Sequence, residues 1–295
     1  MTGLLLLDKP VGITSQQAVR RVQRMTDSRR AGHGGTLDPL AEGLLPILIG
    51  SATRLSRFFL EGDKSYTADL MFGRVTDTQD ITGNTLETHP VNLHRNLIDE
   101  VIAGFLGEVS QLPPMFSALS VGGKRLYKLA RQGVEVERDP RTVTIHAISL
   151  LDFDGFRARL SVTCSKGTYI RTLIHDIGQK LGCGACMSGL RRTSTGDFSV
   201  ADAVTFDTLD QAVADGTVLN HIRAPESLFM DLPVLSPPPF FVKLLKDGQR
   251  VQQHKLGSTL APGEMARLYA EGAFFGLLGE TQTADGTAVA LIWRV

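Results

Sequence analysis

The sequence predicts an α+β fold in which helices flank a mixed, largely antiparallel sheet. Segments 64–73 and 156–164 alternate apolar and polar residues, as half-buried strands do, and 141–150 is also expected to be a strand. Other segments carry apolar residues at helical spacing, around 15–26, around 92–106 and from about 170. The irregular order of these strands and helices is typical of α+β proteins.

Local signals place the ends of the clearest elements. Thr14 and Gln17 have capping-box spacing, so the first helix is expected to begin after Thr14. TDTQDITG (76–83) and SKGT (165–168) are expected to turn the chain after their strands. The helix from about 170 is expected to stop at Gly182, because glycine tolerates the left-handed backbone that often follows a helix.

Two regions depart from this pattern. Residues 111–141 contain a Pro-Pro break, a Gly-Gly turn and a short basic helix, and their few apolar residues cannot fill a core, so a projecting element is expected. The proline-rich stretch 231–241 precedes short β segments, the last two joined through 284–286. We therefore expect one domain over 1–230 and a small β-rich domain over 231–295.

Composition is that of an ordinary globular protein, with 42% apolar residues, 21% charged residues and zero formal net charge. No apolar run approaches the ~18 residues of a membrane span. The leucines of MTGLLLLDKP are followed at once by Asp8, Lys9 and Pro10, too soon for a signal peptide, so a cytoplasmic location is expected. Cys183 and Cys186 form a C-x-x-C pair, but no second ligand pair accompanies it, and packed thiols are expected rather than a metal site.

The charges are unevenly distributed along the chain. Residues 14–57 hold seven arginines, whereas residues 201–231 hold six acidic residues and one arginine. The stretch 120–131 has four basic residues and no acid: Lys124, Arg125, Lys128 and Arg131. Such asymmetry is typical of a polyanion-binding face, with an ordinary solvated charge run as the alternative.

The stretch AGHGGTLDPLAEGLLPI (31–47) places a single carboxylate, Asp38, between a glycine-rich loop and an apolar run. Asp-Pro fits the N-cap and first position of a helix, where a cap stabilises by ~1 kcal/mol. Alternatively, Gly34 and Gly35 allow a ligand to approach the backbone, and His33 offers a ring for stacking or proton transfer. The spacing alone favours the cap, and the surrounding loop favours a catalytic carboxylate.

Two other residues belong to this hypothesis. Tyr66 lies on the apolar face of the strand 64–73, where a core tyrosine is the ordinary interpretation. Arg171 begins an apolar helix just after Tyr169, and an arginine that points inward there needs a carboxylate partner. Asp38 is the candidate, and the pairing would keep that carboxylate ionised, as a nucleophile must be.

Several segments together resemble the bacterial tRNA pseudouridine-55 synthases of the TruB family. They occur in the order of that family and span most of residues 3–200: LLLLDKPVGITS (4–15), AGHGGTLDPLAEGLLPILIGSATRLSRF (31–58), KSYTADLMFGRVTDTQDITG (64–83), PPMFSALSVGGKRLYKLARQGVEVER (113–138), CSKGTYIRTLIHDIGQKLGCGA (164–185) and LRRTSTG (190–196). The resemblance implies an isomerase with a pseudouridine synthase-like fold that converts uridine to pseudouridine in the tRNA T-arm, with no metal and no organic cofactor.

The resemblance also implies roles for particular residues. Asp38 would be the nucleophile, Arg171 its partner, and Tyr66 the residue that packs on the base and takes the C5 proton. His33 would help to hold the RNA after the base has flipped, and Leu190 would line the pocket. Further substrate contacts are implied for a group of polar and glycine residues: Lys9, Gly35, Lys124, Arg125 and Tyr169.

Regions outside the pocket take their expected roles from the same resemblance. Residues 111–141 would grip RNA, and 231–295 would be a PUA-like domain reaching the tRNA acceptor end. Phe116 and Ser120 stand where the family often has tyrosine and lysine, and the second change removes a cation from the gripping element. A monomer acting without a guide RNA is expected.

Some alternatives stay open at this level. Asp38 could attack C1′ or C6, or remove the C2′ proton to give a glycal. A non-catalytic RNA-binding or RNA-folding module, and a guide-dependent relative, are the rival functions. A phosphate-binding metabolic enzyme is excluded as a reading of GHGG, which lacks the G-x-x-x-x-G-K-[ST] pattern.

Overall fold

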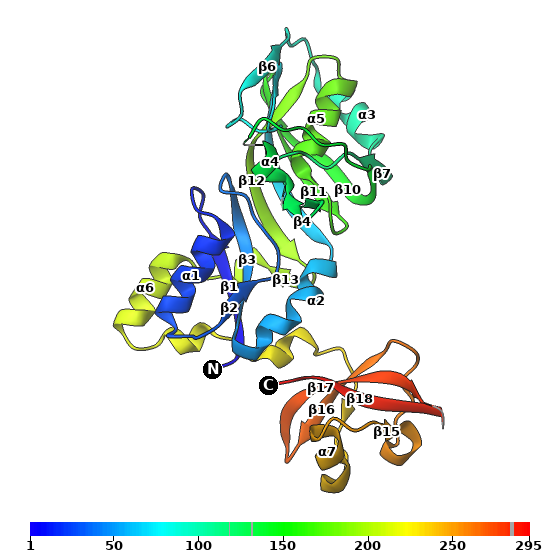
Figure 1. Cartoon of the computed structure of the whole chain (residues 1–295). Coiled ribbons are helices and arrows are strands. Elements are labelled where there is room, and N and C mark those ends of the chain that lie inside the picture. Colours follow the sequence, from blue (N-terminus) through cyan, green and yellow to red (C-terminus); the bar gives the residue numbers. More distant parts are fainter. Residues whose placement is uncertain (118, 131, 284–285) are drawn as a thin grey trace.

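A computed structural model describes residues 1–295 apart from 118, 131 and 284–285 (Figure 1). Its larger sheet follows the order β1-β3-β12-β4-β11-β10-β7, with β2 on β3 and β13 on β12. The strands of this sheet are β1 (Gly3–Lys9), β2 (Ala31–His33), β3 (Ala41–Ile49), β4 (Lys64–Phe72), β7 (Gly107–Gln111), β10 (Arg141–Phe153), β11 (Arg157–Cys164), β12 (Ala185–Thr195) and β13 (Phe198–Ser199).

Strand β12 joins the two halves of this sheet. It runs parallel to β3 on one side, pairing Leu190 with Ala41, and antiparallel to β4 on the other, pairing Arg192 with Tyr66. The other strand pairs described in this sheet are antiparallel. The predicted mixed, largely antiparallel α+β architecture is therefore confirmed.

Strand β1 is bound on both of its edges. On one side it pairs with β3 along its whole length. On the other side its backbone exchanges hydrogen bonds with residues that are far away in the sequence, near Val204 and Arg223. The four leucines of β1 are buried, because they alternate between two apolar clusters.

Helices cover the sheet where their apolar faces predict. Helix α1 (Ser15–Met25) begins with the expected capping box of Thr14 and Gln17, and α5 (Ile170–Lys180) ends before Gly182, whose φ is +75°. Helix α3 (Arg95–Ala103) is shorter than predicted. The remaining helical segments are α2 (Ser56–Glu61), α4 (Leu126–Ala130), α6 (Phe206–Ala214), α7 (Pro239–Lys246) and the 3-10 turns η1 (Gly50–Leu55), η2 (Val200–Asp202), η3 (Val218–His221), η4 (Pro225–Leu228) and η5 (Gln253–Leu256).

The core has separate apolar clusters on the two halves of the sheet. Helices α3 and α5 pack on β4, β10, β11 and β12, whereas α1 and α6 pack on β1 and β3. Cys183 and Cys186 are buried thiols in this packing, as expected from their lack of partner ligands. No described helix is long and apolar enough to cross a bilayer.

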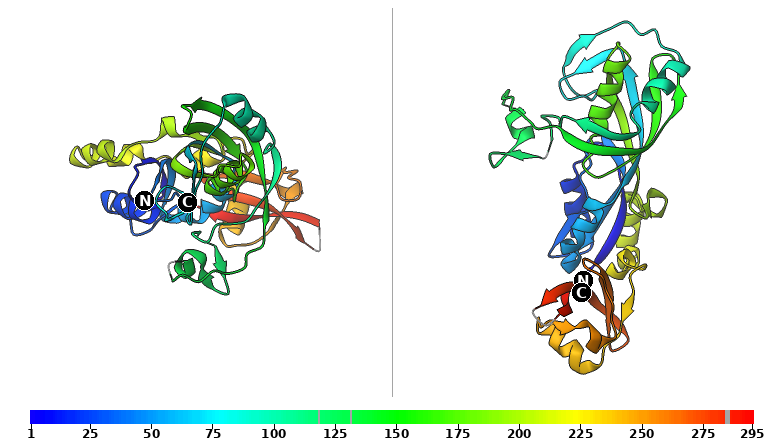
Figure 2. Two further views of the ribbon diagram at one scale, coloured as in Figure 1. Left: turned by 90° about the horizontal axis from the view of Figure 1, so that it is seen from above. Right: turned by 90° about the vertical axis from the view of Figure 1, so that its right-hand side faces the viewer.

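The expected projecting element begins and ends in the sheet, where Gln111 of β7 pairs with Arg141 of β10, and the described residues between them include β8 (Ser120–Val121), β9 (Lys124–Arg125) and α4. Figure 2 shows this segment standing out from the body in the view turned about the vertical axis. Lys124 is exposed near its end, and Arg125 is exposed beside it. Arg131, which was counted with this basic stretch, lies outside the described residues.

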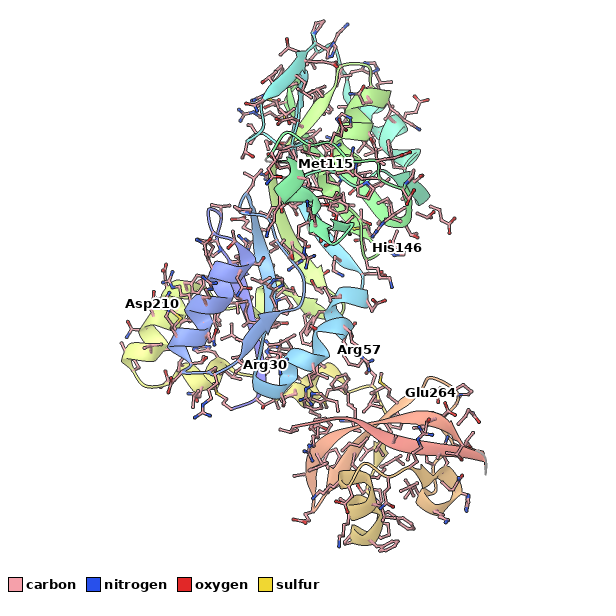
Figure 3. The ribbon with its side chains drawn as sticks, in the orientation of Figure 1. Arg30, Arg57, Met115, His146, Asp210 and Glu264 are labelled. Atoms are coloured by element: carbon pink, nitrogen blue, oxygen red, sulfur yellow. The ribbon has the colours of Figure 1, made fainter. Side chains whose placement is uncertain are left out.

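The acidic residues near the C-terminal end of the larger body are partly compensated. Asp210 of α6 pairs with Arg21 of α1 at 2.6 Å, so one of the arginines of 14–57 neutralises one of the carboxylates of 201–231. Figure 3 shows Asp210 on the α6 side of the molecule and His146 on the opposite side. The uneven charge of the sequence therefore survives only in part on the folded surface.

The C-terminal residues form a second sheet in the order β14-β16-β17-β18-β15. Its strands are β14 (Val234–Leu235), β15 (Val251–Gln252), β16 (Met265–Ala270), β17 (Ala273–Thr283) and β18 (Gly286–Arg294), and a short hairpin elsewhere joins β5 (Arg74–Thr76) to β6 (Thr85–Thr88). The indole of Trp293 donates to the Ser51 carbonyl at 3.1 Å. Trp293 and Leu277 also pack among buried residues of the larger body, so the two sheets meet through an apolar contact.

Candidate active site

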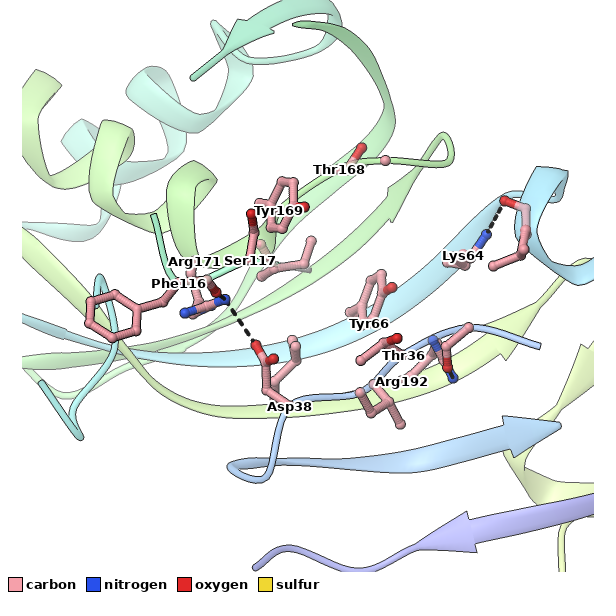
Figure 4. A pocket seen from close by; sticks show the side chains of 16 residues that line it. Thr36, Asp38, Lys64, Tyr66, Phe116, Ser117, Thr168, Tyr169, Arg171 and Arg192 are labelled. Carbon is pink, nitrogen blue, oxygen red and sulfur yellow. Dashed lines mark hydrogen bonds and ion pairs between the residues drawn. The ribbon is translucent and has the colours of Figure 1, made fainter. Parts of the chain in front are cut away.

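A cavity of about 320 Å³ opens where the sheet, the 35–38 loop and the start of α5 meet (Figure 4). Its walls come from five separate parts of the chain, which explains why no single motif reveals it. The lining residues are Gly35, Thr36, Leu37, Asp38, Leu60, Lys64, Tyr66, Phe116, Ser117, Gly167, Thr168, Tyr169, Ile170, Arg171, Leu190 and Arg192. The structure thus brings Asp38, Tyr66 and Arg171 together.

Asp38 does not cap a helix, which corrects one interpretation of the Asp-Pro pair. The Ala41 amide donates to the Asp38 carbonyl at 3.0 Å and closes a β-turn, and strand β3 follows directly. Asp at the first position and Pro at the second also favour a β-turn, so the same dipeptide serves both structures. The buried apolar run after it decides the outcome, because it supplies a central strand of the sheet.

The backbone beside Asp38 is held on both sides. The Ser15 hydroxyl donates to the Leu37 carbonyl at 2.9 Å and accepts from the Leu37 amide at 2.8 Å. The Gly12 amide donates to the Pro39 carbonyl at 2.7 Å. Because these bonds tie the turn to the start of α1, the carboxylate projects into the cavity from a fixed mount.

Arg171 holds the Asp38 carboxylate from the other side of the cavity. Its Nη2 lies 3.1 Å from Asp38 Oδ2, and its Nη1 lies 3.5 Å from Oδ2 of a second carboxylate, Asp80. The same guanidinium donates to the carbonyls of Thr78 at 3.1 Å and Phe116 at 2.9 Å. Its side chain is 7% exposed and that of Asp38 is 42% exposed, so the arginine is buried and the carboxylate faces the cavity.

Asp80 is a site residue that the sequence reasoning missed. One of its oxygens accepts from the Thr82 amide at 2.9 Å and from the Thr78 hydroxyl at 2.9 Å, which closes the 76–83 turn. The other oxygen faces Arg171. Two polar residues on either side of an aspartate in a predicted turn are a signal of such a self-bonded carboxylate, although they do not indicate its distant partner.

Tyr66 lies on the buried face of β4, with 8% of its surface exposed, and its ring lines the cavity. Burial raises the pKa of the Tyr66 phenol, and the neighbouring Arg192 guanidinium opposes that rise. The ring therefore offers an apolar face for a base, and its hydroxyl lies beside a cation.

Arg192 was also missed, although Leu190 was expected two residues earlier. Alternation along β12 places both side chains on the cavity side. Arg192 is only 1% exposed, and its Nε donates to the Leu44 carbonyl at 2.7 Å while Nη2 donates to the Gly35 carbonyl at 3.2 Å. Because residues two apart on a strand share a face, the expected position of Leu190 could have predicted that Arg192 lines the cavity.

Lys64, two residues before Tyr66, supports the rim of the cavity. Its ammonium donates to the carbonyls of Phe59 at 3.1 Å and Leu60 at 3.2 Å, at the end of α2. A cation at this end satisfies carbonyls that have no partner within the helix. Burial lowers the pKa of Lys64, and Arg192 lowers it further.

Two expected substrate contacts, Lys9 and His33, are not among the residues that line the cavity. Lys9 is fully buried and donates to the carbonyls of Pro10 at 2.8 Å and Ile13 at 2.9 Å, so it supports a turn rather than lining the cavity. Burial lowers its pKa to about 8. His33 lies on β2 and accepts from the Gly35 amide at 3.4 Å. Burial and then the charge of Arg192 lower the pKa of His33, which favours the neutral ring.

The other expected contacts divide between the cavity and the projecting segment. Gly35, Tyr169 and Leu190 line the cavity, whereas Lys124 and Arg125 lie on the β8–β9 hairpin. Among the described residues, no three His, Cys, Asp or Glu side chains converge as metal ligands would. The arrangement offers a half-exposed carboxylate beside an arginine and, across a small cavity, an aromatic ring beside a second arginine.

Comparison with known families identifies the family of this chain. Residues 23–170 match the model of the TruB family pseudouridylate synthase N-terminal domain, and residues 171–229 match that of the tRNA pseudouridylate synthase B C-terminal domain. The chain belongs to the TruB family. It is therefore a pseudouridine synthase, an isomerase, as the sequence resemblance predicted.

Relatives and solved structures extend this family assignment over the whole chain. The tRNA pseudouridine synthase B of Methylobacillus flagellatus is 46% identical, over 97% of this chain and 92% of that protein. The protein of the same name from an Azoarcus species is 43% identical, over 96% and 92%. A chain in the crystal structure of a Cbf5-Nop10-Gar1 complex is 27% identical and matches 99% of this TruB-family chain and 84% of its own length, with a TM-score of 0.75.

Proposed function

We propose that this TruB-family enzyme isomerises uridine 55 in the T-arm of tRNA, using Asp38 as the nucleophile. The choice of tRNA is supported by relatives named tRNA pseudouridine synthase B at 43% and 46% identity. One observation carries the catalytic part. Asp38 faces the cavity, 3.1 Å from Arg171, and Tyr66 lines the same space.

The substrate uridine has to leave the folded T-arm before it can enter this cavity. Extruding a nucleotide costs a few kcal/mol, and stacking on an aromatic ring returns ~1–3 kcal/mol. Tyr66 provides the ring, because its buried strand fixes the orientation of its face. Bound RNA would cover the half-exposed Asp38 carboxylate and displace water from it, which would strengthen each electrostatic contact in the cavity.

Asp38 then acts as the charged group of the reaction. It attacks C1′ or C6, or removes the C2′ proton to give a glycal, and each route begins from the ionised carboxylate. Arg171 favours that ionised state and fixes the orientation of the carboxylate. Asp80 and two backbone carbonyls hold Arg171 from behind, so the pair is set before the substrate arrives.

After the base turns, C5 bonds to C1′ and the C5 proton leaves. We assign its removal to Tyr66, which lies across the cavity from Asp38. Outside the cavity, Lys124 and Arg125 on the projecting segment grip the RNA backbone, and residues 231–295, as a PUA-like domain, reach the acceptor end. His33, beside the glycine loop, helps to hold the RNA after the base has flipped. The enzyme works as a cytoplasmic monomer without a guide RNA.

The test uses purified protein and a T-arm stem-loop transcript carrying tritium at C5 of its uridines. Release of tritium and mapping of the product report pseudouridine at position 55. A second transcript with cytidine at that position is the RNA control. Full conversion of the first transcript alone is expected. Absence of product without an added RNA guide, or product at other positions, would contradict the proposal.

A matched pair of variants tests the nucleophile. Asp38→Asn removes the negative charge but keeps a residue that suits the first position of the turn. Glu42→Gln removes a nearby carboxylate that pairs with Arg191 at 3.2 Å, outside the cavity lining. We expect the first variant to fold and form no product, and the second to remain active. Activity in a folded Asp38→Asn protein would end the catalytic assignment.

A further inference from the structure

Arg192 is a buried cation without a carboxylate partner. Among the described residues no acidic oxygen lies within ion-pair distance of it, whereas Arg171 and Arg191 each pair with two carboxylates. Its side chain is nevertheless 1% exposed. Burying a charge without a counter-charge is costly, and arginine does not escape that cost by losing its proton at neutral pH.

The position of Arg192 identifies the group that it serves. Arg192 on β12 pairs across the strands with Tyr66 on β4. Its Nε and Nη2 are committed to the carbonyls of Leu44 and Gly35. These two bonds orient the guanidinium so that it lies beside the Tyr66 phenol, on the same side of the cavity in Figure 4 and away from the Asp38–Arg171 pair.

The uncompensated charge is felt by other groups near the cavity. The Arg192 guanidinium contributes, after burial, to lowering the pKa values of His33 and Lys64. It also opposes the rise that burial causes in the pKa of Tyr66. A positive field that disfavours other cations favours an anion at the same place.

We propose that Arg192 is a positioning residue that supplies the counter-charge of a Tyr66 phenolate while that phenolate accepts the C5 proton. This inference rests on the proposed function and gives the second half of the reaction its own electrostatic partner. Arg192 acts through Tyr66 and not on the base.

The C5 proton passes to the Tyr66 oxygen without any change of oxidation state. Once C5 has bonded to C1′, the C5–H bond breaks and its proton passes to the Tyr66 oxygen, giving the neutral phenol. The electron pair of that bond forms the C5–C6 double bond of pseudouridine, and N1 takes up a proton from water. The phenol returns its proton to solvent before the next turnover, so no oxidant or cofactor is consumed.

Other charged groups around Tyr66 do not provide this counter-charge. Cys164 on β11 is a neutral thiol at neutral pH, because burial raises its pKa to about 11. Asp38 is negative and disfavours a phenolate. Arg171 is engaged with two carboxylates, and Lys64 is engaged with the carbonyls at the end of α2. Arg192 is the remaining charged residue that lines the cavity.

Tyrosine titration tests the electrostatic claim without any RNA. The chain has four tyrosines, so 3-fluorotyrosine labelling gives few fluorine resonances, and Tyr66→Phe identifies the one of interest. The ring fluorine also lowers every phenol pKa, so that each titration is reached at a lower pH. Arg192→Met and Arg192→Gln both remove the charge, and the second retains an amide that can reach one of the two carbonyls.

We expect both variants to raise the Tyr66 pKa by about 1, the lower end of the effect of a close opposite charge. Arg191→Gln is the matched control, because Arg191 is the adjacent residue on β12 and pairs with Asp8 and Glu42 instead. That control should leave the Tyr66 pKa unchanged. A folded Arg192→Met or Arg192→Gln protein with the wild-type Tyr66 pKa overturns the proposal.

The rate of a single turnover gives the second readout. Since only the phenolate accepts the proton, the rate should rise with pH until the Tyr66 pKa is passed. Removing the positive charge moves that inflection to higher pH, and lowers the rate at pH 7 about tenfold for each unit of that move. A merely structural role of Arg192 would lower stability or RNA affinity without moving the inflection.

The outcomes separate this inference from the proposed function. If the wild-type protein forms no pseudouridine, the function fails, yet the titration still reports whether Arg192 controls Tyr66. If Asp38→Asn is inactive and the Arg192 variants titrate like the wild type, the function stands and this inference fails. Failure of both Arg192 variants to fold would show that the charge serves the fold, and would also overturn the inference.

Discussion

The two ends of the cavity use an arginine in opposite ways. At one end Arg171 lies between Asp38 and Asp80, and these two carboxylates neutralise its positive charge. At the other end, within the described part of the chain, Arg192 is bonded to backbone carbonyls and lies beside the Tyr66 phenol, with no carboxylate partner. We call the Arg171 end the complete end, because its positive charge is balanced by carboxylates before the substrate enters. We call the Arg192 end the incomplete end, because its positive charge is balanced only when an anion forms beside it.

This difference assigns the two ends to different moments of the reaction. A satisfied ion pair holds a carboxylate that is charged from the start, which suits the group that acts first on the nucleotide. An unpaired cation stabilises a phenolate that burial disfavours until that phenolate takes up a proton, which suits a group that acts as a base late in the reaction. The cost of burying Arg192 is thus offset when the phenolate appears.

The largest expected effect is at the complete end. Asp38→Asn should lower the rate of pseudouridine formation at least about 10³-fold, because a neutral amide cannot replace a nucleophilic carboxylate. The free energy of unfolding should stay within about 0.5 kcal/mol of wild type, since Arg171 retains Asp80 and the side chain is half exposed. Parallel rate and urea-unfolding measurements check both statements, and a large loss of stability would show that the pair serves the fold instead.

The next effect is at the incomplete end. Tyr66→Phe keeps the ring face but removes the oxygen that receives the proton. The rate should fall about 10²- to 10⁴-fold, the range of general-base catalysis. Binding of an inactive T-arm analogue, measured by titration, should change little, because stacking does not need the hydroxyl. Equal losses of rate and affinity would instead make Tyr66 a purely packing residue.

A smaller effect on the rate is expected from changing Asp80, the second carboxylate that pairs with Arg171 at the complete end. Asp80→Asn leaves Arg171 with one carboxylate and weakens the 76–83 turn, because the Asp80 oxygens serve both. We expect the free energy of unfolding to fall by about 2–3 kcal/mol. The rate of pseudouridine formation should fall in part, because Asp38 becomes less well oriented. Thermal unfolding with the single-turnover rate measures the two parts. An unchanged melting temperature would mean that Arg171 is held by Asp38 and the carbonyls alone.

The smallest effect is expected from a change at the start of α1 that alters neither end of the cavity. Thr14→Ala removes the hydroxyl that accepts from the Gln17 amide at 3.1 Å at the start of α1. Stability should fall by about 1 kcal/mol, as for other N-caps, and activity at moderate temperature should be unchanged. Because α1 also carries Ser15, which anchors Leu37, a loss of activity in this variant would show that α1 transmits disorder to the Asp38 turn.

Local patterns were sufficient wherever one element decided the outcome. Alternation placed Tyr66 on a buried face, the capping box began α1, and the burial of Arg171 among apolar neighbours required a carboxylate nearby. They failed where one signal serves two structures. Asp-Pro precedes a turn and a strand here, and the apolar PFFVKLLK forms α7 although β segments alone were expected in this region.

Other residues escaped because their partners are remote in the sequence. The role of Arg192 depends on Tyr66, its partner on the neighbouring strand. The role of Asp80 depends on Arg171, which lies 91 positions later in the sequence. Lys9 was expected to meet substrate because it lies in a matched motif, yet the carbonyls of Pro10 and Ile13 occupy its ammonium. Strand register and backbone hydrogen bonding decide such cases, and neither is visible in residue spacing.

The double pairing of β1 has a consequence for how this protein is made. Strand β1 leaves the ribosome long before its last neighbours, which lie near Val204 and Arg223. Since synthesis adds roughly 5–20 residues each second, its row of leucines waits ten seconds or more, on the order of 200 residues of synthesis, before its second edge is covered. During that interval the nascent chain carries an apolar ribbon with an open edge, and we expect chaperones that bind such ribbons to be needed most while the first two thirds of the chain are being translated.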